Sequence, residues 1–396
     1  MRFARLAWSA ASGGLFSALT PITAVLLLPP TRYGLFSIVY LVFAFGISLQ
    51  YSIVNEAWAR NRAPSVSDAE WTAFSGALIS LSALVAIAAT VIAFVLPGLR
   101  AAAFFLALSV FFALNRNGSR YHSVAVGVWR RVVISDSAGI AAFAVALVVL
   151  DDLPGIQRVA ASWFASALVA FAVLKLPRFA RGAGPVTWAR RHAGAIRTLL
   201  ADSLLMDFGA IGTPFILAGF LGAAPFGTYR AVSNAALPVR LLVDPVRPIL
   251  GAMHARVLFS RGGLLAVGGV AAFLTGASFT LLEYVIPRIG FSIGTLSSLV
   301  PFAAPAAAFV TGSFLGTVFY IACRTKATRR ALLIGRAVQT GVVVVAPLLG
   351  FSLGGLNGAI WGFAISSLAA AASWTLIAYG LRRLPRSPTG LDIGSA

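Results

Sequence analysis

The sequence predicts an all-α polytopic membrane protein with twelve transmembrane helices. Three observations support this: 59% of the 396 residues are apolar, only 11% are charged, and the mean hydropathy is +0.91. A soluble globular chain carries about 25% charged and about 45–50% apolar residues. The composition therefore excludes a soluble enzyme of ordinary design, a disordered chain and a nucleic-acid-binding domain.

Twelve apolar stretches are long enough to cross a bilayer, which takes about 20 mostly apolar residues per helix. Continuous apolar runs such as 138–150 favour helices, because a transmembrane strand would alternate apolar and polar residues. The first stretch ends in Pro-Pro-Thr-Arg, which is not typical of a signal-peptide cleavage site. The predicted spans are 6–28, 34–57, 71–96, 101–118, 132–150, 159–176, 198–221, 226–248, 263–287, 293–322, 331–349 and 355–380.

The positions of the basic residues predict the orientation, because cytoplasmic loops collect Lys and Arg. With both termini in the cytoplasm, 23 of the 31 Lys and Arg residues fall inside, four in outer loops and four within spans. Omitting one span would destroy this alternation. The sequence thus predicts a multi-pass protein of the cell (cytoplasmic or inner) membrane. The basic residues that give the net charge of +20 then lie on the membrane face, where they meet anionic headgroups. The charge therefore does not indicate nucleic-acid binding.

An internal repeat accompanies a division into two six-helix halves. At an offset of 193 residues, Thr20-Pro21 matches Thr213-Pro214, Tyr33-Gly34 matches Phe226-Gly227, and Phe36 matches Tyr229. Parallel six-helix halves are typical of transporters that rock one half against the other. We predict an N-terminal bundle at 1–176, a basic cytoplasmic connector at 177–197, a C-terminal bundle at 198–380 and a cytoplasmic tail at 381–396.

The segments around the repeated positions resemble a known family. The run Leu-Pro-Pro-Thr-Arg-Tyr33-Gly34-Leu-Phe36-Ser and the turn between spans seven and eight, Phe220 to Ala231, are similar to those of polysaccharide flippases. These belong to the multidrug/oligosaccharidyl-lipid/polysaccharide exporter superfamily. The resemblance implies a V-shaped, alternating-access pair of bundles that flips a lipid-linked oligosaccharide for lipopolysaccharide or capsule export. Twelve helices resemble oligosaccharide flippases, whereas lipid II flippases usually carry two more.

The eighth predicted span carries the residues that we expect to bind substrate. A charge inside a membrane is costly, so each one is a functional candidate. Arg240 lies near the middle of the span, while Arg230 and Asn234 share a second helical face. Arginine suits phosphate because its planar guanidinium donates two parallel hydrogen bonds. We predict Arg240, Arg230 and Asn234 as substrate-binding residues for a polyprenyl-(pyro)phosphate headgroup.

Two acids are candidate coupling residues. Asp207 is the deepest acid of the seventh predicted span, and Asp244 lies one turn beyond Arg240. Either one is placed to exchange H+ or Na+ during transport. Two structural interpretations stay open: Arg240 pairs with Asp207 or Asp244 to lock helices together, or the span ends before Asp244 and Arg240 lies shallower. Charged residues nearer to span ends are expected to reach headgroups or to form local ion pairs, for instance Asp136 with Arg130 or Arg131. These residues are Glu56, Asp136, Asp202, Glu283 and Arg336.

We expect no catalytic residues, cofactor, metal site or nucleic-acid partner. The expected partners are a lipid-linked oligosaccharide, membrane lipids, H+ or Na+, and glycan-assembly proteins. One alternative is a membrane-embedded glycan polymerase or glycosyltransferase, but every predicted outer loop is short. Another is a cation-coupled drug exporter of the same superfamily, against which the deep Arg240 argues.

Overall fold

The computed structural model contains helices as its only regular secondary structure in the part of the chain that it describes. That part comprises residues 2–60, 68–174, 176–177, 184–236, 238–239, 242–243, 250, 255–289, 292–324 and 327–382. Within these ranges, nine helical segments are long and apolar enough to cross a membrane. The chain is therefore an all-α multi-pass membrane protein, as predicted. The number of twelve spans stays a prediction.

Most of the helices coincide with predicted spans, although several are composite and helix α11, Ala223–Asn234, ends well before the predicted end of the eighth span at 248. Three of them contain a five-residue π-helical segment, labelled η1, η3 or η4. The bounds are α1 Arg2–Leu27, α2 Pro30–Gln50, η1 Tyr51–Asn55, α3 Glu56–Arg60, α4 Asp68–Val95, η2 Pro97–Ala102, α5 Ala103–Ala125, α6 Trp129–Val149, α7 Gly155–Val173, α8 Pro185–Arg191, α9 Ala193–Asp207, η3 Phe208–Gly212, α10 Thr213–Leu221, α11 Ala223–Asn234, α13 Ala255–Leu258, α14 Arg261–Thr280, η4 Leu281–Val285, α15 Ile286–Arg288, η5 Leu296–Phe302, α16 Ala303–Arg324 and α17 Arg329–Leu381.

The last helix, α17, contains two of the predicted spans joined by a kink. Gly354 and Gly355 have non-helical backbone angles, and Gly355 has a φ of +55°, a conformation open mainly to glycine. The two arms then pack very closely. A Cβ atom on Gly358 would lie 1.9 Å from the carbonyl oxygen of Gly350, and one on Gly362 would lie 2.2 Å from that of Ala346. Small residues therefore permit the antiparallel contact of the two arms.

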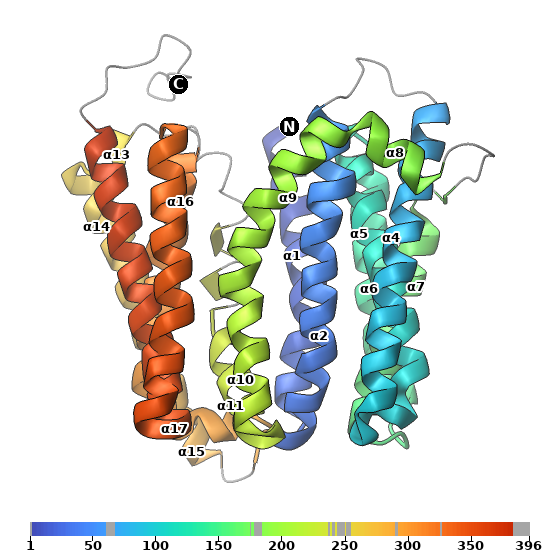
Figure 1. Ribbon diagram of the computed structural model, residues 1–396. Coiled ribbons are helices and arrows are strands. Elements are labelled where there is room, and N and C mark those ends of the chain that lie inside the picture. The colour runs from blue at the N-terminus through green and yellow to red at the C-terminus, as the bar shows by residue number, and fades with distance from the viewer. Residues whose placement is uncertain are drawn as a thin grey trace. The chain divides into compact units, whose positions relative to one another are not determined.

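The chain divides into two compact units, Met1–Asp207 and Phe208–Ala396, and within each unit the long helices run side by side (Figure 1). In the first unit α8 lies across one end of the helices, where the Trp188 indole donates to the Ile53 carbonyl at 2.8 Å. Helix α9 also packs with this unit, since the Ser203 and Ser52 hydroxyls are 2.6 Å apart. The predicted division at the 177–197 connector is a prediction that these contacts do not test.

The positions of the sequence repeat are buried in both units. Tyr33 and its counterpart Phe226 are each 1% exposed, and Phe36 and Tyr229 are 1% and 0% exposed. Each pair thus occupies an interior position near the start of a helix, in α2 and in α11 respectively. This shared burial supports the predicted internal repeat.

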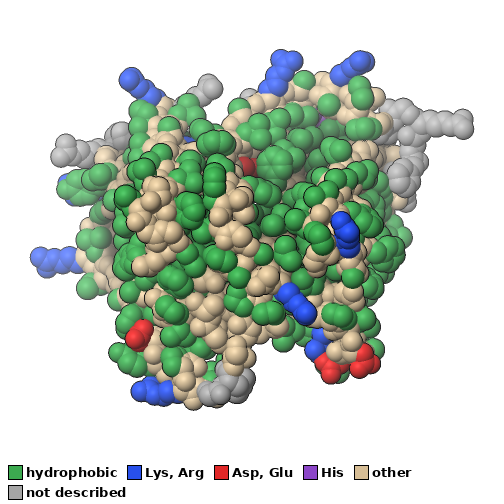
Figure 2. Space-filling view, turned by 60° about the horizontal axis from the view of Figure 1, so that its bottom comes forward, with side chains coloured by type: hydrophobic (Ala, Val, Ile, Leu, Met, Phe, Trp, Pro, Cys, Tyr) green, Lys and Arg blue, Asp and Glu red, His purple; other side chains and the backbone are tan. Residues whose placement is uncertain are grey.

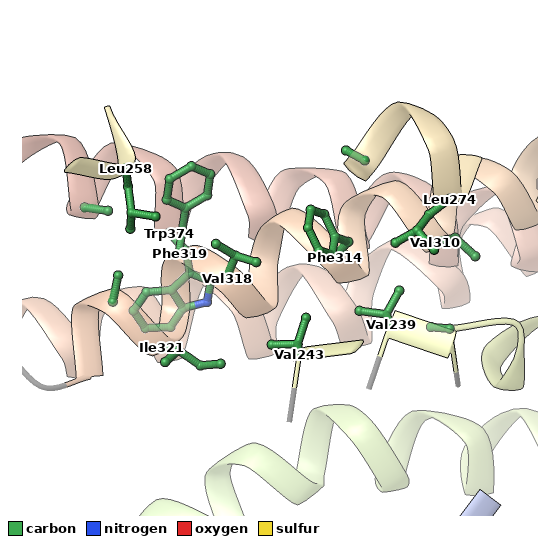
Figure 3. Close-up of a cluster of buried hydrophobic side chains, with 14 of the residues drawn as sticks. Val239, Val243, Leu258, Leu274, Val310, Phe314, Val318, Phe319, Ile321 and Trp374 are labelled. Atoms are coloured by element: carbon green, nitrogen blue, oxygen red, sulfur yellow. The ribbon is translucent and has the colours of Figure 1, made fainter. Parts of the chain in front are cut away.

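The core and the surface of the second unit are both apolar. In its core, Phe314 and Val318 of α16 pack with Trp374 of α17 and with Val239 and Val243 (Figure 3). Large apolar side chains are also exposed on the molecule, and hydrophobic atoms dominate the face seen in Figure 2. Contiguous exposed apolar surface of this kind is expected of helices that face lipid.

Candidate functional site

The predicted substrate-binding residues begin on α11. This helix starts after Gly222, whose φ of +68° allows the sharp turn from α10. Arg230 lies two-thirds of the way along the helix and is only 8% exposed, so its guanidinium is inside the second unit. Asn234 is the last residue of the helix and is half-buried. Because a buried charge is costly in a membrane protein, Arg230 remains a candidate functional residue.

The other two candidates of the eighth predicted span, Arg240 and Asp244, lie outside the described residues. Their described neighbours Val239 and Val243 are 1% and 2% exposed and belong to the apolar core of the second unit. Val239 and Val243 therefore pack with residues of α16 (Figure 3). The roles of Arg240 and Asp244 stay predictions.

Asp207 occupies a distinctive position in the chain. It is the last residue of α9, and the π-helix η3 begins with the next residue. The boundary between the two compact units falls at the same place. Asp207 is buried, with 5% of its surface exposed. Since π-helical turns occur frequently at functional sites, this position supports a functional interpretation of Asp207.

A buried arginine–aspartate network in the first unit corrects one expectation. Asp136 is fully buried, and its partners are Arg116 and Arg120, not Arg130 or Arg131. The Arg116 guanidinium donates to one carboxylate oxygen, while Arg120 Nε donates to the other at 3.2 Å. The Ser12 hydroxyl adds a third donor at 2.8 Å. This network joins α1, α5 and α6.

The expectation was wrong because α5 is longer than the predicted span 101–118. It continues to Ala125, so Arg120 lies within the helix, one turn beyond Arg116, and not in a loop. The helix ends in a Schellman motif: Val128 N–H donates to the Ser123 carbonyl at 2.9 Å, and Gly127 N–H donates to the Val124 carbonyl at 3.1 Å. Gly127 has a φ of +83°. That glycine was the sequence signal for the true helix end.

The described residues show how the remaining charged candidates are placed. Glu283 is exposed in η4, which agrees with a position near headgroups. Arg336, by contrast, is only 6% exposed. The side chain of Asp202 lies outside the described part of the chain. No group of three or more His, Cys, Asp or Glu residues that could hold a metal is found among the described residues.

Comparisons with solved structures identify the fold. The lipid II flippase MurJ in an inward closed conformation matches with a TM-score of 0.64 at 10% identity, over 92% of this chain and 86% of that chain. An inward-facing multidrug resistance MATE family transporter of the MOP superfamily matches with a TM-score of 0.59 at 16% identity, over 95% and 94% of the two chains.

A third match is a MOP superfamily transporter from Pyrococcus furiosus, for which reverse polarity of the binding pocket suggests a different function. Its TM-score is 0.54 at 13% identity, over 96% of both chains. No protein-family model and no curated protein matches the sequence. At these identities the likeness establishes the fold, which this chain shares with MurJ and the MATE transporters.

Proposed function

We propose that this protein is a transporter that moves a polyprenyl-(pyro)phosphate-linked oligosaccharide from the cytoplasmic to the outer leaflet of the cell membrane. One observation carries the proposal: Arg230 is a buried arginine in a fold shared with a lipid II flippase. A buried guanidinium binds a phosphate oxyanion through parallel hydrogen bonds. The transported glycan serves cell-surface polysaccharide synthesis, such as lipopolysaccharide or capsule export.

In this proposal Arg240 is the main headgroup anchor, Arg230 is the second anchor, and Asn234 contributes an amide. The membrane potential favours outward movement of the anionic headgroup, by about 2.3 kcal/mol per charge per 100 mV. Binding must therefore stay moderate, so that the headgroup leaves at the outer face. Glycan-assembly proteins are the proposed partners that supply and remove the lipid-linked glycan.

Asp207 and Asp244 are the proposed coupling residues for H+ or Na+. The burial of Asp207 and its position at the boundary between the two units in the sequence support this role. Binding or release of a cation at Asp207 would change the charge at the point where α9 ends and the π-helix η3 begins. Asp207→Asn should abolish the dependence of transport on a pH gradient. Transport by this variant with normal gradient dependence would exclude Asp207 as the proton carrier.

The anchors are tested by measuring glycan export together with protein abundance in cells. Arg240→Gln should nearly abolish export, and Arg240→Lys should reduce it, because lysine keeps the charge but loses the planar fork. Arg230→Gln should reduce export less. Arg382→Gln is the matched control, since Arg382 lies at the end of α17 on the exposed Tyr379. Normal export by a well-expressed Arg240→Gln protein would contradict the proposal.

The orientation of the chain is tested with reporter fusions. Fusions after Arg62, Arg131, Arg191 and Arg330 should read cytoplasmic, and fusions at Gly155 and Gly222 should read external, because basic residues stay inside. One inverted reading among the first four would break the twelve-span arrangement with cytoplasmic termini.

A cation-coupled drug exporter is the second candidate, and the structural likeness to MATE transporters favours it. The two functions predict different phenotypes when the gene is deleted. A flippase defect causes lipid-linked glycan to accumulate at the inner leaflet, while an exporter defect sensitises cells to lipophilic cations. Unchanged lipid-linked glycan together with increased drug sensitivity would favour the exporter.

A further inference from the structure

Arg336 is a second buried arginine of the C-terminal unit, separate from the residues proposed above. It is the eighth residue of α17, so a rise of 1.5 Å per residue places it about 10 Å inside the helix. The residue is 6% exposed. At this depth a guanidinium keeps its charge, because arginine is not deprotonated in proteins.

The described partners of Arg336 are electrically neutral. Its Nη1 atom donates to Gln339 Oε1 at 3.2 Å, and its Nη2 atom donates to the Tyr320 hydroxyl. The guanidinium carbon also lies 4.6 Å from the centre of the Tyr320 ring. Among the residues that the structure describes, no carboxylate forms an ion pair with Arg336. These described partners accept from two of its five N–H donors and carry no negative charge.

The side chains around Arg336 are held in place by their own contacts. The Trp374 indole donates to the same Gln339 oxygen at 3.0 Å, and the Trp374 and Tyr320 rings lie 4.9 Å apart. Gly335 makes room for the indole, because a Cβ atom there would lie 2.8 Å from Trp374 Cζ3. Two donors at one oxygen fix the Gln339 amide, so its NH₂ group remains available as a further donor.

We propose that Arg336, together with the Gln339 amide, binds a phosphate-type oxyanion in the C-terminal unit. The remaining guanidinium donors match two oxygens of one phosphate in the parallel geometry that arginine favours. The anion supplies the negative charge that Tyr320 and Gln339 lack. Its source is a lipid headgroup or a soluble phosphate, since both present the same chemistry.

A purely structural role does not explain the charge. Tyr320, Gln339 and Trp374 already join α16 to both arms of α17 through their mutual contacts. A neutral side chain at position 336 would preserve these contacts without the cost of burying a charge. Retention of a guanidinium is explained when an anion binds it.

Binding is measured by isothermal titration calorimetry on the full-length protein in phosphatidylcholine nanodiscs. The probes are inorganic pyrophosphate, as the soluble source, and geranylgeranyl pyrophosphate, as a lipid-linked source. We expect Arg336→Gln to weaken binding by about tenfold or more, since a lost hydrogen bond to a charged group has that effect. Saturation by both probes indicates a phosphate site, and saturation by the lipid probe alone indicates a lipid headgroup site.

Two further variants keep the test decisive. Arg382→Gln is the matched control, because Arg382 makes the same contacts with Tyr379 at the exposed end of α17, and it should bind as the unchanged protein does. If Arg336→Gln does not accumulate, Arg336→Lys should still bind at least about threefold more weakly because it lacks the fork. Equal binding with and without the Arg336 guanidinium, or no binding of either probe to the unchanged protein, would overturn the proposal.

This inference rests on the proposed function only in the choice of a lipid pyrophosphate as one probe. Binding is measured without transport, so a failure of the anion site and a failure of the flippase proposal are distinguishable. A protein that binds pyrophosphate through Arg336 and exports no glycan would keep the site and reject the transport function.

Discussion

Both compact units bury an arginine well inside a helix, but they surround it differently. In the first unit, the charge of Arg116 is compensated by the fully buried Asp136, which also accepts from Arg120 and Ser12. In the second unit, Arg336 meets a tyrosine and a glutamine, with no carboxylate partner within the described ranges. The residue type is the same, but of these two described networks only the first contains a carboxylate.

The difference indicates two roles. The Asp136 network holds helices together, whereas the Arg336 network presents a positive charge to which an anion can bind. The Asp136 network joins three helices, and the Arg116 guanidinium carbon also lies 3.7 Å from the centre of the Phe16 ring. The polar groups of this network therefore bind one another. The Arg336 network is built from neutral groups that orient a charge without cancelling it. Buried ion pairs are costly to break, whereas a buried charge without an acid leaves nothing behind when it is removed. The variants below use this distinction.

The largest effect should follow Asp136→Asn. The change removes the carboxylate that accepts from the buried Arg116 and the half-buried Arg120, which costs about 3–5 kcal/mol of unfolding free energy. Thermal unfolding and accumulation of the purified protein in detergent provide the measurement. Asp151→Asn is the control: its side chain is 73% exposed beside Arg158, and the loss should stay below about 1 kcal/mol. Equal stability of the two variants would show that Asp136 does not hold α1, α5 and α6 together.

The two arginines themselves should respond unequally to methionine, which has a similar length but no charge. Arg116→Met removes the donor to Oδ1 of the buried Asp136, whereas Arg120 and Ser12 donate to Oδ2, so we expect a loss of about 2–3 kcal/mol. Arg336→Met leaves no orphan acid among the described residues, and the change should stay within about 1 kcal/mol. Denaturant unfolding of both variants side by side tests this. A larger loss for Arg336→Met would indicate an acid partner outside the described residues.

Each network lies beside a glycine, which offers a smaller test. A Cβ atom on Gly335 would meet the Trp374 ring at 2.8 Å, and one on Gly13 would meet Arg120 Nη2 at 2.2 Å. Gly335→Ala should cost about 1–3 kcal/mol, because a packed indole cannot move aside easily. Gly13→Ala should cost about 1 kcal/mol or less, because the end of the Arg120 side chain can rotate. Gly341→Ala, with no atom within 4 Å, is the control, and a loss as large as that of Gly335→Ala would contradict the packing argument.

The smallest effect concerns pH and the first unit alone. His192 lies between α8 and α9, and burial beside Trp188, followed by the charge of Arg191, lowers the pKa of its imidazole below the ordinary value. The unfolded chain therefore binds a proton more readily than the folded chain does. Stability should fall as the pH decreases below about 6.5, the ordinary pKa of histidine. Unfolding at pH 7.5 and 5.5 should show this decrease, and His192→Gln should reduce it; an unchanged pH dependence would contradict the assignment.

Several features of the fold were predictable because their causes are local. Continuous apolar runs predicted the helices, and the break predicted between 349 and 355 coincides with the kink at Gly354 and Gly355. Glycine also recurs every four residues at 350, 354, 358 and 362, a spacing typical of closely packed membrane helices, and Gly350, Gly358 and Gly362 lie at short backbone contacts. The error at the end of α5 was also local, because Gly127 marked the true end of the helix.

The candidate site was predictable only in part. The sequence placed Arg230 and Asp207 within predicted spans, and both side chains are buried. Their partners were not predictable, and the same holds for Arg336, which was expected to reach headgroups or pair locally. Its hydrogen-bond partner Tyr320 comes from the preceding helix, and Trp374 comes from the other arm of α17. Proximity of this kind depends on how the helices pack.

The sequence by itself determined that this chain is a helical, multi-pass membrane protein, because a membrane helix satisfies its backbone hydrogen bonds within one segment. Apolar length and charge spacing are therefore sufficient signals. Only the tertiary structure decided which buried charges are compensated. Asp136 is 20 residues from Arg116 and 124 residues from Ser12, and their contact exists because α1, α5 and α6 pack together. Electrostatic balance at depth is a property of that packing, since it depends on side chains from helices far apart in the sequence.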